Sequence, residues 1–257
     1  HARGMGVVVD VVPNHMAVPT PLYLNRALWS VLREGPDSPY GSWFDGTESE
    51  DGILMPVLGA RIGTVLAAGE LSIDRMVVPG LEDEGEVAVL RYFDHVFPLR
   101  EGSESLPLDR LVQHQHYRLA YWKVADEELN YRRFFDVDTL AAVRVEDPDV
   151  FDATHTLLLD LYRAGHIDGF RIDHPDGLAD PRGYMRRLSN ATGGAWIVGE
   201  KILEAHEQLP TDWPVAGTSG YDVSWRVDGL QVDPNGAVEL TRLAEELTGA
   251  SQSLPAL

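Results

Sequence analysis

Three short apolar segments, each ending in polar residues, constrain the fold of this chain most strongly. They are VVVDVV (7–12), the end of HIDGFRID (166–173) and the start of AWIVGEKI (195–202). The first is rich in β-branched residues and almost continuously apolar, which is typical of a parallel strand covered by other elements. The chain is therefore predicted to contain a parallel sheet whose strands end in polar residues.

Helical segments alternate with these strands in the second half of the chain. In residues 147–165 the apolar positions fall on one helical face, with Asp147 placed as an N-cap and Gly165 as the residue that ends the helix. Further helices are expected in 180–194 and 234–249, with a short strand between them around WPVAGTSGYD. The alternation of strand and helix predicts an α/β fold, either doubly wound or closed as a (β/α)8 barrel.

The first half of the chain is less regular. A helix is expected in 19–35, where leucines and a tryptophan recur at helical spacing before Gly35. The stretch from 35 to 145 mixes short strand-like runs with glycine, proline and acidic turns, and it has no repeat. We therefore expect three regions: residues 1–34 with one strand and its helix, an insertion subdomain in 35–145, and further strands and helices in 146–257.

The composition excludes several classes of function. The 257 residues include 41 acidic and 21 basic side chains, a formal net charge of −20, which disfavours nucleic acid and anionic membranes as partners. There is no cysteine, so the chain has neither disulfides nor thiolate metal sites. No apolar run approaches the roughly 18 residues of a membrane span. A soluble, cytoplasmic protein is the expectation.

Two carboxylates stand at the ends of consecutive strands. Asp173 and Glu200 are separated by about one strand–helix unit, so neighbouring strands could hold them about 5 Å apart, as a retaining glycosidase requires of its nucleophile and general acid/base. Arg171 lies two residues before Asp173, on the same side of its strand. We expect the guanidinium to keep Asp173 ionised as the nucleophile, while a less compensated Glu200 keeps its proton as the acid.

The motifs at the three strand ends resemble those of a known enzyme family. DVVPNH (10–15), GFRID (169–173) and VGE (198–200) resemble the first three signature regions of the α-amylase clan of glycoside hydrolases. The resemblance implies a (β/α)8 TIM barrel of the α-amylase type, of which this chain holds about strands 3 to 6, with the clan's long insertion after strand 3. The clan usually has a basic residue and a histidine three and four places after the nucleophile, where this chain has Asp176 and Gly177.

That departure resembles one branch of the clan, the maltooligosyl trehalose synthases. RIDHPDGL, NYRRFFDV, RYFDHVFPL, EKIL and VAGTSGYDV all agree with that branch. The resemblance implies an isomerase that converts the reducing-end α-1,4 linkage of a maltooligosaccharide into an α,α-1,1 linkage. It also implies a functional partner, a maltooligosyl trehalose trehalohydrolase that acts on the product.

The resemblance also suggests supporting residues. His15 and Asp10 match clan positions that contact the sugar and support the catalytic arginine, respectively. The aromatic and basic residues Tyr121, Trp122, Tyr131 and Arg132 are candidates for a wall that excludes water from the intermediate. No cofactor is implied. Although Asn14 matches a calcium ligand of many amylases, we infer no metal.

Other interpretations remain open. The clan's third carboxylate, on strand 7, has no counterpart here, and Asp222 in GYDV is taken as structural, so we expect a fragment of a longer enzyme that is inactive alone. An α-1,4-glucan hydrolase or glucanotransferase on the same scaffold would share the same motifs. A different class is an inactive carbohydrate-binding protein, although both candidate carboxylates and Arg171 are present.

Overall fold

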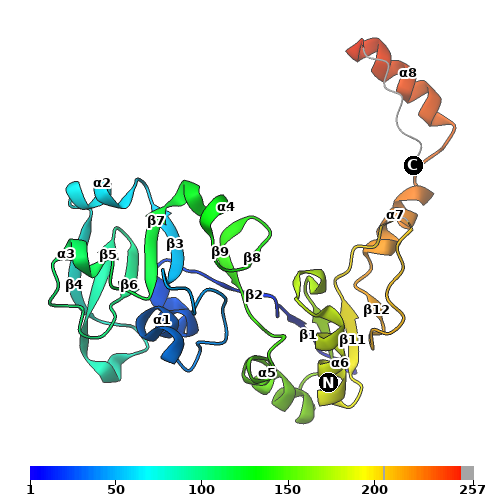
Figure 1. The fold of residues 1–257 in the computed structure, drawn as a ribbon. Helices are drawn as coiled ribbons and strands as arrows, with labels where there is room; N and C mark the ends of the chain where they lie inside the picture. Colours follow the sequence, from blue (N-terminus) through cyan, green and yellow to red (C-terminus); the bar gives the residue numbers. More distant parts are fainter. Residues whose placement is uncertain (205, 250–257) are drawn as a thin grey trace.

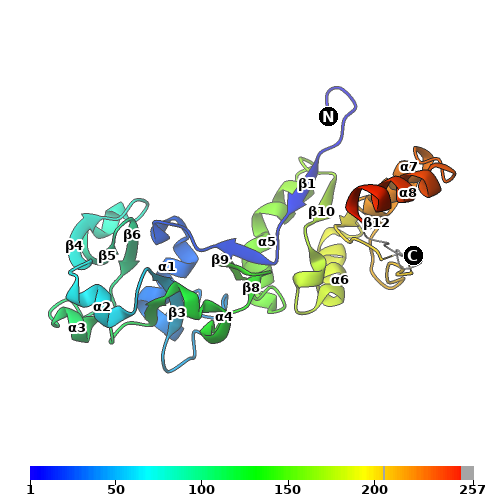
Figure 2. The ribbon, with the colours of Figure 1, turned by 90° about the horizontal axis from the view of Figure 1, so that it is seen from above.

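The computed structural model describes residues 1–204 and 206–249, which form two lobes (Figure 1). We call residues 14–145 the insertion lobe, and residues 1–13 together with the described residues from 146 onward the sheet lobe. Figures 1 and 2 both place the strands β8 and β9 between the two lobes. No helix in the described ranges is long and apolar enough to cross a membrane.

A parallel sheet organises the sheet lobe. Its strands, in spatial order, are β1 (Val8–Val11), β10 (Gly169–Ile172), β11 (Trp196–Gly199) and β12 (Gly217–Thr218). All three pairings are parallel. The three strands expected from the apolar segments are therefore confirmed, and so is the parallel sheet.

Three helices of this lobe begin and end near the residues that the sequence indicates, namely α5 (Pro148–Arg163), α6 (Pro181–Thr192) and α8 (Gly236–Thr248). A fourth helix, α7 (Tyr221–Leu230), was not predicted, and it begins where the expected short strand was placed. Asp147 caps α5 by accepting a hydrogen bond from the amide of Asp149 at 2.9 Å. Gly165 follows the helix with φ +73°, a left-handed conformation that glycine adopts without strain.

The sheet has one covered face and one that the described residues leave open. Phe170, Ile172 and Ile197 are fully buried, and the ring of Phe170 lies 5.6 Å from that of Tyr162 on α5. Arg171, between two of these residues, points to the opposite face because side chains alternate along a strand. On β1 the side chain of Val8 is 50% exposed. The apolar first strand is thus covered less completely within this chain than its composition predicts.

The insertion lobe is built from three small sheets and short helices. The sheets are β2 (His15–Ala17) with β9 (Val137–Ala142) and β8 (Arg133–Phe134), β3 (Ile53–Leu58) with β7 (Tyr117–Tyr121), and β4 (Leu71–Val77) with β5 (Glu86–Tyr92) and β6 (His95–Pro98). The helices are α1 (Arg26–Glu34), α2 (Ile62–Ala67), α3 (Leu108–Leu111) and α4 (Ala125–Glu128). One connected set of buried apolar side chains extends from Phe44 and Phe97 in this lobe to Phe151 and Phe170 in the sheet lobe.

Helix α1 differs from the expectation in length and in place. The helix expected over 19–35 starts at Arg26, because Asn25 caps it by accepting a hydrogen bond from the amide of Leu28 at 3.0 Å. A separate 3-10 turn, Leu22–Leu24, precedes it. Helix α1 packs beside β6 and this turn in the insertion lobe rather than along the first strand of the parallel sheet. Its amphipathic pattern predicted a helix but could not specify which sheet it would contact.

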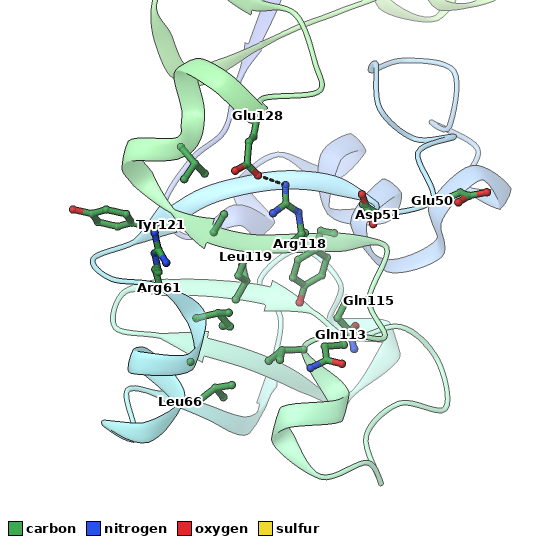
Figure 3. A pocket seen from close by; sticks show the side chains of 16 residues that line it. Glu50, Asp51, Arg61, Leu66, Gln113, Gln115, Arg118, Leu119, Tyr121 and Glu128 are labelled. Carbon is green, nitrogen blue, oxygen red and sulfur yellow. Dashed lines mark hydrogen bonds and ion pairs between the residues drawn. The ribbon is translucent and has the colours of Figure 1, made fainter.

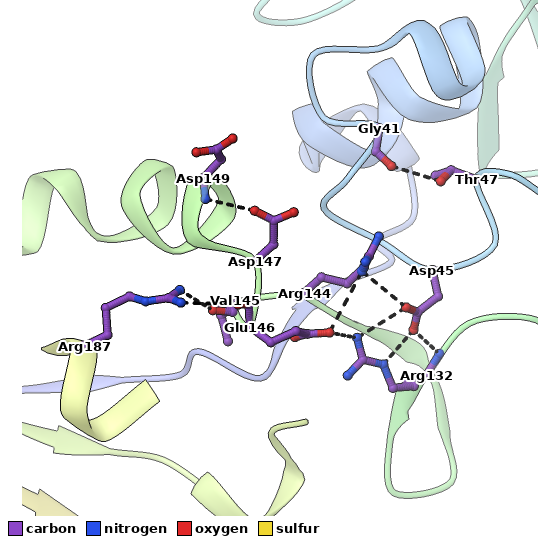
Figure 4. Close-up of polar contacts among 10 residues, drawn as sticks. All are labelled: Gly41, Asp45, Thr47, Arg132, Arg144, Val145, Glu146, Asp147, Asp149 and Arg187. Carbon is purple, nitrogen blue, oxygen red and sulfur yellow. Dashed lines mark hydrogen bonds and ion pairs between the residues drawn. The ribbon is translucent and has the colours of Figure 1, made fainter. Parts of the chain in front are cut away.

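Charged residues tie the insertion lobe to the start of α5 (Figure 4). Arg132 donates to Asp45 at 2.8 Å and to Glu146 at 2.7 Å, so a residue before β8 is joined to the segment that leads into α5. Burial raises the pKa of Asp45, but the hydrogen bonds from Arg132 outweigh that effect and hold the pKa below its ordinary value. This network fixes the chain where it returns to the parallel sheet.

Candidate active site

The register of the parallel strands brings the candidate residues to one edge of the sheet. Asp10 on β1 is aligned with Arg171 on β10. The ladder continues one step past the strands, because the amide of Asp173 donates to the carbonyl of Val11 at 2.9 Å and that of Glu200 to the carbonyl of Ile172 at 2.8 Å. The side chains at these strand ends therefore leave the sheet side by side, as expected for parallel strands.

Arg171 lies at the centre of a cluster of three carboxylates. Its Nη1 donates to both oxygens of Asp10 at 2.7 and 2.8 Å and to Oδ1 of Asp173 at 3.3 Å. Its Nη2 lies 2.8 Å from Oε1 of Glu200. Three carboxylates around a single guanidinium leave negative charge uncompensated, which favours retention of a proton within the cluster.

The retained proton belongs to the pair formed by Asp173 and Glu200, whose carboxyl groups share a hydrogen bond. Burial, that hydrogen bond and the charge of Glu200 raise the pKa of Asp173. Burial also raises the pKa of Glu200, but its hydrogen bonds with Asp173 and with the amide of His174, together with the charge of Arg171, lower it overall. The pKa of Asp173 is therefore raised and that of Glu200 lowered relative to their ordinary values.

That order is the reverse of the sequence-based expectation, in which Arg171 compensated Asp173 and left Glu200 protonated. The physical reason is the number of donors. Glu200 accepts hydrogen bonds from the His174 amide at 3.2 Å and the Tyr221 hydroxyl at 3.1 Å and forms an ion pair with Arg171 Nη2. Asp173 accepts one hydrogen bond of 3.3 Å from Arg171 Nη1. Arg171 does lower the pKa of Asp173, as expected, but two donors to Glu200 come from residues that the sequence did not single out.

Tyr221 and His174 were both missed. Tyr221 starts α7, in the GYDV segment, whose neighbouring Asp222 accepts a hydrogen bond from the Thr218 hydroxyl. His174 directly follows Asp173 and adopts a left-handed backbone conformation with φ 39°, which turns its amide toward Glu200. For His174 the available signal was its place directly after Asp173, where the strand ends, and for Tyr221 it was the VAGTSGYDV motif, which resembles the family branch.

Two phenylalanines border the cluster from the insertion lobe. The ring of Phe134 lies 4.3 Å from that of His15 and 5.0 Å from that of His174, and Phe135 lies 4.8 Å from His174. Burial lowers the pKa of His15, while the charge of Asp173 opposes that shift. The last two residues of the NYRRFF motif, Phe134 and Phe135, thus place aromatic rings beside the strand ends.

The structure does not bring the four residues expected to form a wall to the carboxylates. Tyr131 is buried, and its hydroxyl donates to the carbonyl of Asp138 at 3.1 Å. Arg132 is held by the ion pairs described above. Tyr121 lines a separate cavity in the insertion lobe, and Trp122 is 54% exposed beside Lys123. The aromatic residues of NYRRFF do lie beside the strand ends, but they are Phe134 and Phe135 and not the residues chosen from the sequence.

The departure at Asp176 and Gly177 has a structural reason. Lys201, directly after Glu200, bridges Asp176 at 3.0 Å and Glu207 at 2.6 Å, so the basic residue lies on the neighbouring strand end and Asp176 is its partner. A Cβ at Gly177 would lie 2.5 Å from Nδ2 of Asn14, so a larger residue there would require the Asn14 side chain to move. Among the described residues, no group of three or more His, Cys, Asp or Glu side chains is placed to hold a metal ion.

The geometry of the site suits one class of chemistry. Paired carboxyl groups at neighbouring ends of parallel strands, with an arginine between them, are suited to the acid/base and nucleophilic chemistry of retaining glycosidases and transglycosidases. The chain is similar over its whole length to one group of such enzymes, the maltooligosyl trehalose synthases, as the sequence motifs predict.

Known proteins of this group are similar to the chain in sequence and in structure. A curated Mycobacterium tuberculosis protein, provisionally named maltooligosyl trehalose synthase, is 39% identical over 100% of this chain and 31% of its own length. The structure of maltooligosyltrehalose synthase from Arthrobacter ramosus has 42% identity and a TM-score of 0.84, over 98% of this chain and 32% of that one. The structure of a hypothetical maltooligosyl trehalose synthase of Sulfolobus tokodaii has 36% identity and a TM-score of 0.70, over 86% of this chain and 28% of that one.

No protein-family model matches the chain. The chain spans about a third of the length of the curated relatives it matches, since its alignment covers 31% of theirs. The similarity therefore concerns about one third of the length of these enzymes.

Proposed function

We propose that the full-length gene product containing this chain is an intramolecular transglucosylase that converts the reducing-end α-1,4 linkage of maltooligosaccharides into an α,α-1,1 linkage. The observation that carries the proposal is the hydrogen-bonded carboxyl pair of Asp173 and Glu200 beside Arg171. The maltooligosyl trehalose synthases, similar along the whole chain, supply the substrate class. The parallel sheet would form an arc of a (β/α)8 barrel, with its open face turned inward.

The proposed reaction uses the one proton that the pair shares. When the sugar enters, this proton passes to Glu200, and the Asp173 carboxylate attacks the anomeric carbon while the glycosidic bond breaks. Glu200 protonates the departing oxygen of the terminal glucose. Glu200 then takes the proton of the anomeric hydroxyl of the retained glucose, and that oxygen displaces Asp173 to form the new linkage. Atoms and charge balance, and no water is consumed.

Asp10 and His15 would have supporting roles. Asp10 accepts two hydrogen bonds from Arg171 and so fixes the plane of the guanidinium between the two reacting carboxyls. His15 packs against Phe134 beside Asp173, where a bound sugar would lie. Phe134 and Phe135 are suited to exclude water, which separates transfer to the retained glucose from hydrolysis. A trehalohydrolase that cleaves the product would be the functional partner, and a cytoplasmic location remains a prediction.

A product assay tests this function. The full-length gene product is incubated with maltohexaose, and reducing ends and products are measured. We expect reducing ends to disappear without net hydrolysis, and a non-reducing hexasaccharide to accumulate. Appearance of shorter reducing sugars would instead support an α-1,4-glucan hydrolase or glucanotransferase. Binding of maltohexaose without any product would support an inactive carbohydrate-binding protein.

Substitutions connect the product to the pair. Asp173→Asn and Glu200→Gln should each lower turnover by at least about a thousandfold, since each removes one of the two reacting groups. Asp212→Asn is the control, because Asp212 pairs with Arg182 on the surface at 2.9 Å and lies outside the cluster. Turnover by either pair variant at the rate of the Asp212 control would contradict the proposed mechanism.

A further inference from the structure

A second cavity lies in the insertion lobe, away from the carboxylates. It has a volume of about 670 Å³ and is bordered by β7, by α2 and by the residues that follow α3 (Figure 3). This volume is in the range of small-molecule sites. Figure 1 places β7 and α2 in the insertion lobe, whereas β10 and β11, which carry Asp173 and Glu200, lie in the other lobe.

The polar groups of this cavity divide into two sets. In its floor, Gln115 donates to the carbonyl of Leu111 at 2.7 Å and accepts from the amide of Arg100 at 2.7 Å, and the Tyr117 hydroxyl donates to a carbonyl. At its rim, the side chains of Arg61, Gln113 and Tyr121 make no hydrogen bond or ion pair with any other described residue. The polar groups of the floor thus already have hydrogen-bond partners, whereas those of the rim can donate to and accept from a ligand.

The charges of the lining disfavour an anionic ligand. Arg118 is neutralised by Glu128, with Nη2 and Oε2 2.7 Å apart. Glu50 and Asp51 leave the lining with a net negative charge despite Arg61, in a chain whose formal net charge is −20. A phosphate or carboxylate would therefore be repelled. A neutral ligand fits better.

Apolar side chains complete the description of the ligand. Leu66 and Leu119 line the cavity between the polar ends, and Tyr121 presents an aromatic ring on the same side as Arg61 (Figure 3). A sugar ring has apolar C–H faces, which pack on leucine and tyrosine, and a rim of hydroxyl groups, which both donate and accept hydrogen bonds. A neutral oligosaccharide combines these features.

We propose that this cavity is a second carbohydrate-binding site, which holds a segment of neutral glucan without reacting with it. That the glucan is α-1,4-linked rests on the function proposed above. A long maltodextrin bound here would be retained by the protein independently of the reaction at the carboxyl pair. Tyr121 is the residue that stacks on the sugar, and Arg61 and Gln113 hydrogen-bond its hydroxyls.

Gly63 provides a size-graded test. It lies in α2 and lines the cavity, and a Cβ built on it meets no atom within 4 Å. Gly63→Trp would therefore fill the cavity from a helical position that accepts a side chain, whereas Gly63→Ala leaves the cavity open. Tyr121→Ala removes the stacking ring, and Arg110→Ala, an exposed arginine of α3 outside the lining, is its control.

The assay is native affinity electrophoresis of the full-length gene product through gels that contain soluble starch, with turnover of maltopentaose measured in parallel. We expect the wild type, Gly63→Ala and Arg110→Ala to be retarded equally, and Gly63→Trp to be retarded less, because only the carboxyl-pair site still binds starch. Tyr121→Ala should weaken the apparent affinity about tenfold, the equivalent of about 1.4 kcal/mol. Turnover of the short substrate should be unchanged in all four variants.

Two results would overturn the proposal: a wild-type protein that starch does not retard, or a Gly63→Trp variant retarded as strongly as Gly63→Ala. Failure of the trehalose-forming function is distinguishable. If the maltohexaose assay yields no non-reducing product while Gly63→Trp is still retarded less than Gly63→Ala, the second site is supported and the proposed reaction is contradicted.

Discussion

Removal of the Arg171 guanidinium is the most decisive perturbation of the proposed site. Arg171→Ala would leave Asp10, Asp173 and Glu200 at one sheet edge without the cation that now contacts all three. Because Arg171 lowers the pKa of both reacting carboxyls, its removal raises both. The acidic limb of the pH–rate profile should therefore move to higher pH, since a carboxylate is needed for attack.

The size of the effect follows from the contacts. The side chains of Asp173 and Glu200 are 23% and 20% exposed, so their bonds to Arg171 are partly shielded from water, whereas Asp10 is 58% exposed and is left out of the estimate. A hydrogen bond to a charged group contributes about 1.5–3 kcal/mol. Loss of the hydrogen bond to Asp173 and of the ion pair with Glu200, taken at the same magnitude, is about 3–6 kcal/mol, which corresponds to a fall in kcat/KM of roughly a hundredfold to ten-thousandfold.

The assay is kcat/KM for maltohexaose as a function of pH in the full-length gene product. Arg171→Lys keeps one charge but lacks the planar fork that reaches several carboxylates, so it should fall between wild type and Arg171→Ala. Arg182→Ala removes an arginine from an exposed ion pair with Asp212 and should stay within about twofold of wild type. A value for Arg171→Ala within tenfold of wild type would refute the reasoning.

Four further predictions concern single side chains. Tyr221→Phe removes a hydroxyl donor to Glu200 and so raises the pKa of that carboxyl, which should move the acidic limb of the pH–rate profile upward while KM changes little. Tyr184→Phe leaves Nε2 of buried His155 without its 2.8 Å partner and should cost about 1–3 kcal/mol of stability in urea unfolding. Burial lowers the pKa of His155 to about 4, so its contribution of about 3 kcal/mol is complete above pH 6.5 and is lost as the pH falls toward 4. Asp147→Ala, which removes the N-cap of α5, should cost about 1 kcal/mol, and an unchanged melting temperature would contradict the cap assignment.

Local patterns predicted the elements of the sheet lobe well, because each depends on residues near in sequence. The apolar strands, the Asp147 cap and the glycine after α5 all occur where periodicity and capping chemistry place them. The same is true of Asp173 and Glu200 as neighbours, since parallel strands of similar length end at one edge. The lobe that receives α1 was not predictable, because an amphipathic face does not specify its partner.

The hydrogen-bond donors to the carboxylates of the site were decided by tertiary structure. The sequence by itself determined that carboxylates and an arginine stand at strand ends, and its motifs identified the maltooligosyl trehalose synthases as relatives. It did not determine that Tyr221, at the start of a later helix, and the left-handed turn at His174 would supply the donors that make Glu200 the better compensated carboxyl. A pKa depends on the distances between groups remote in sequence, and those distances exist only once the chain has folded.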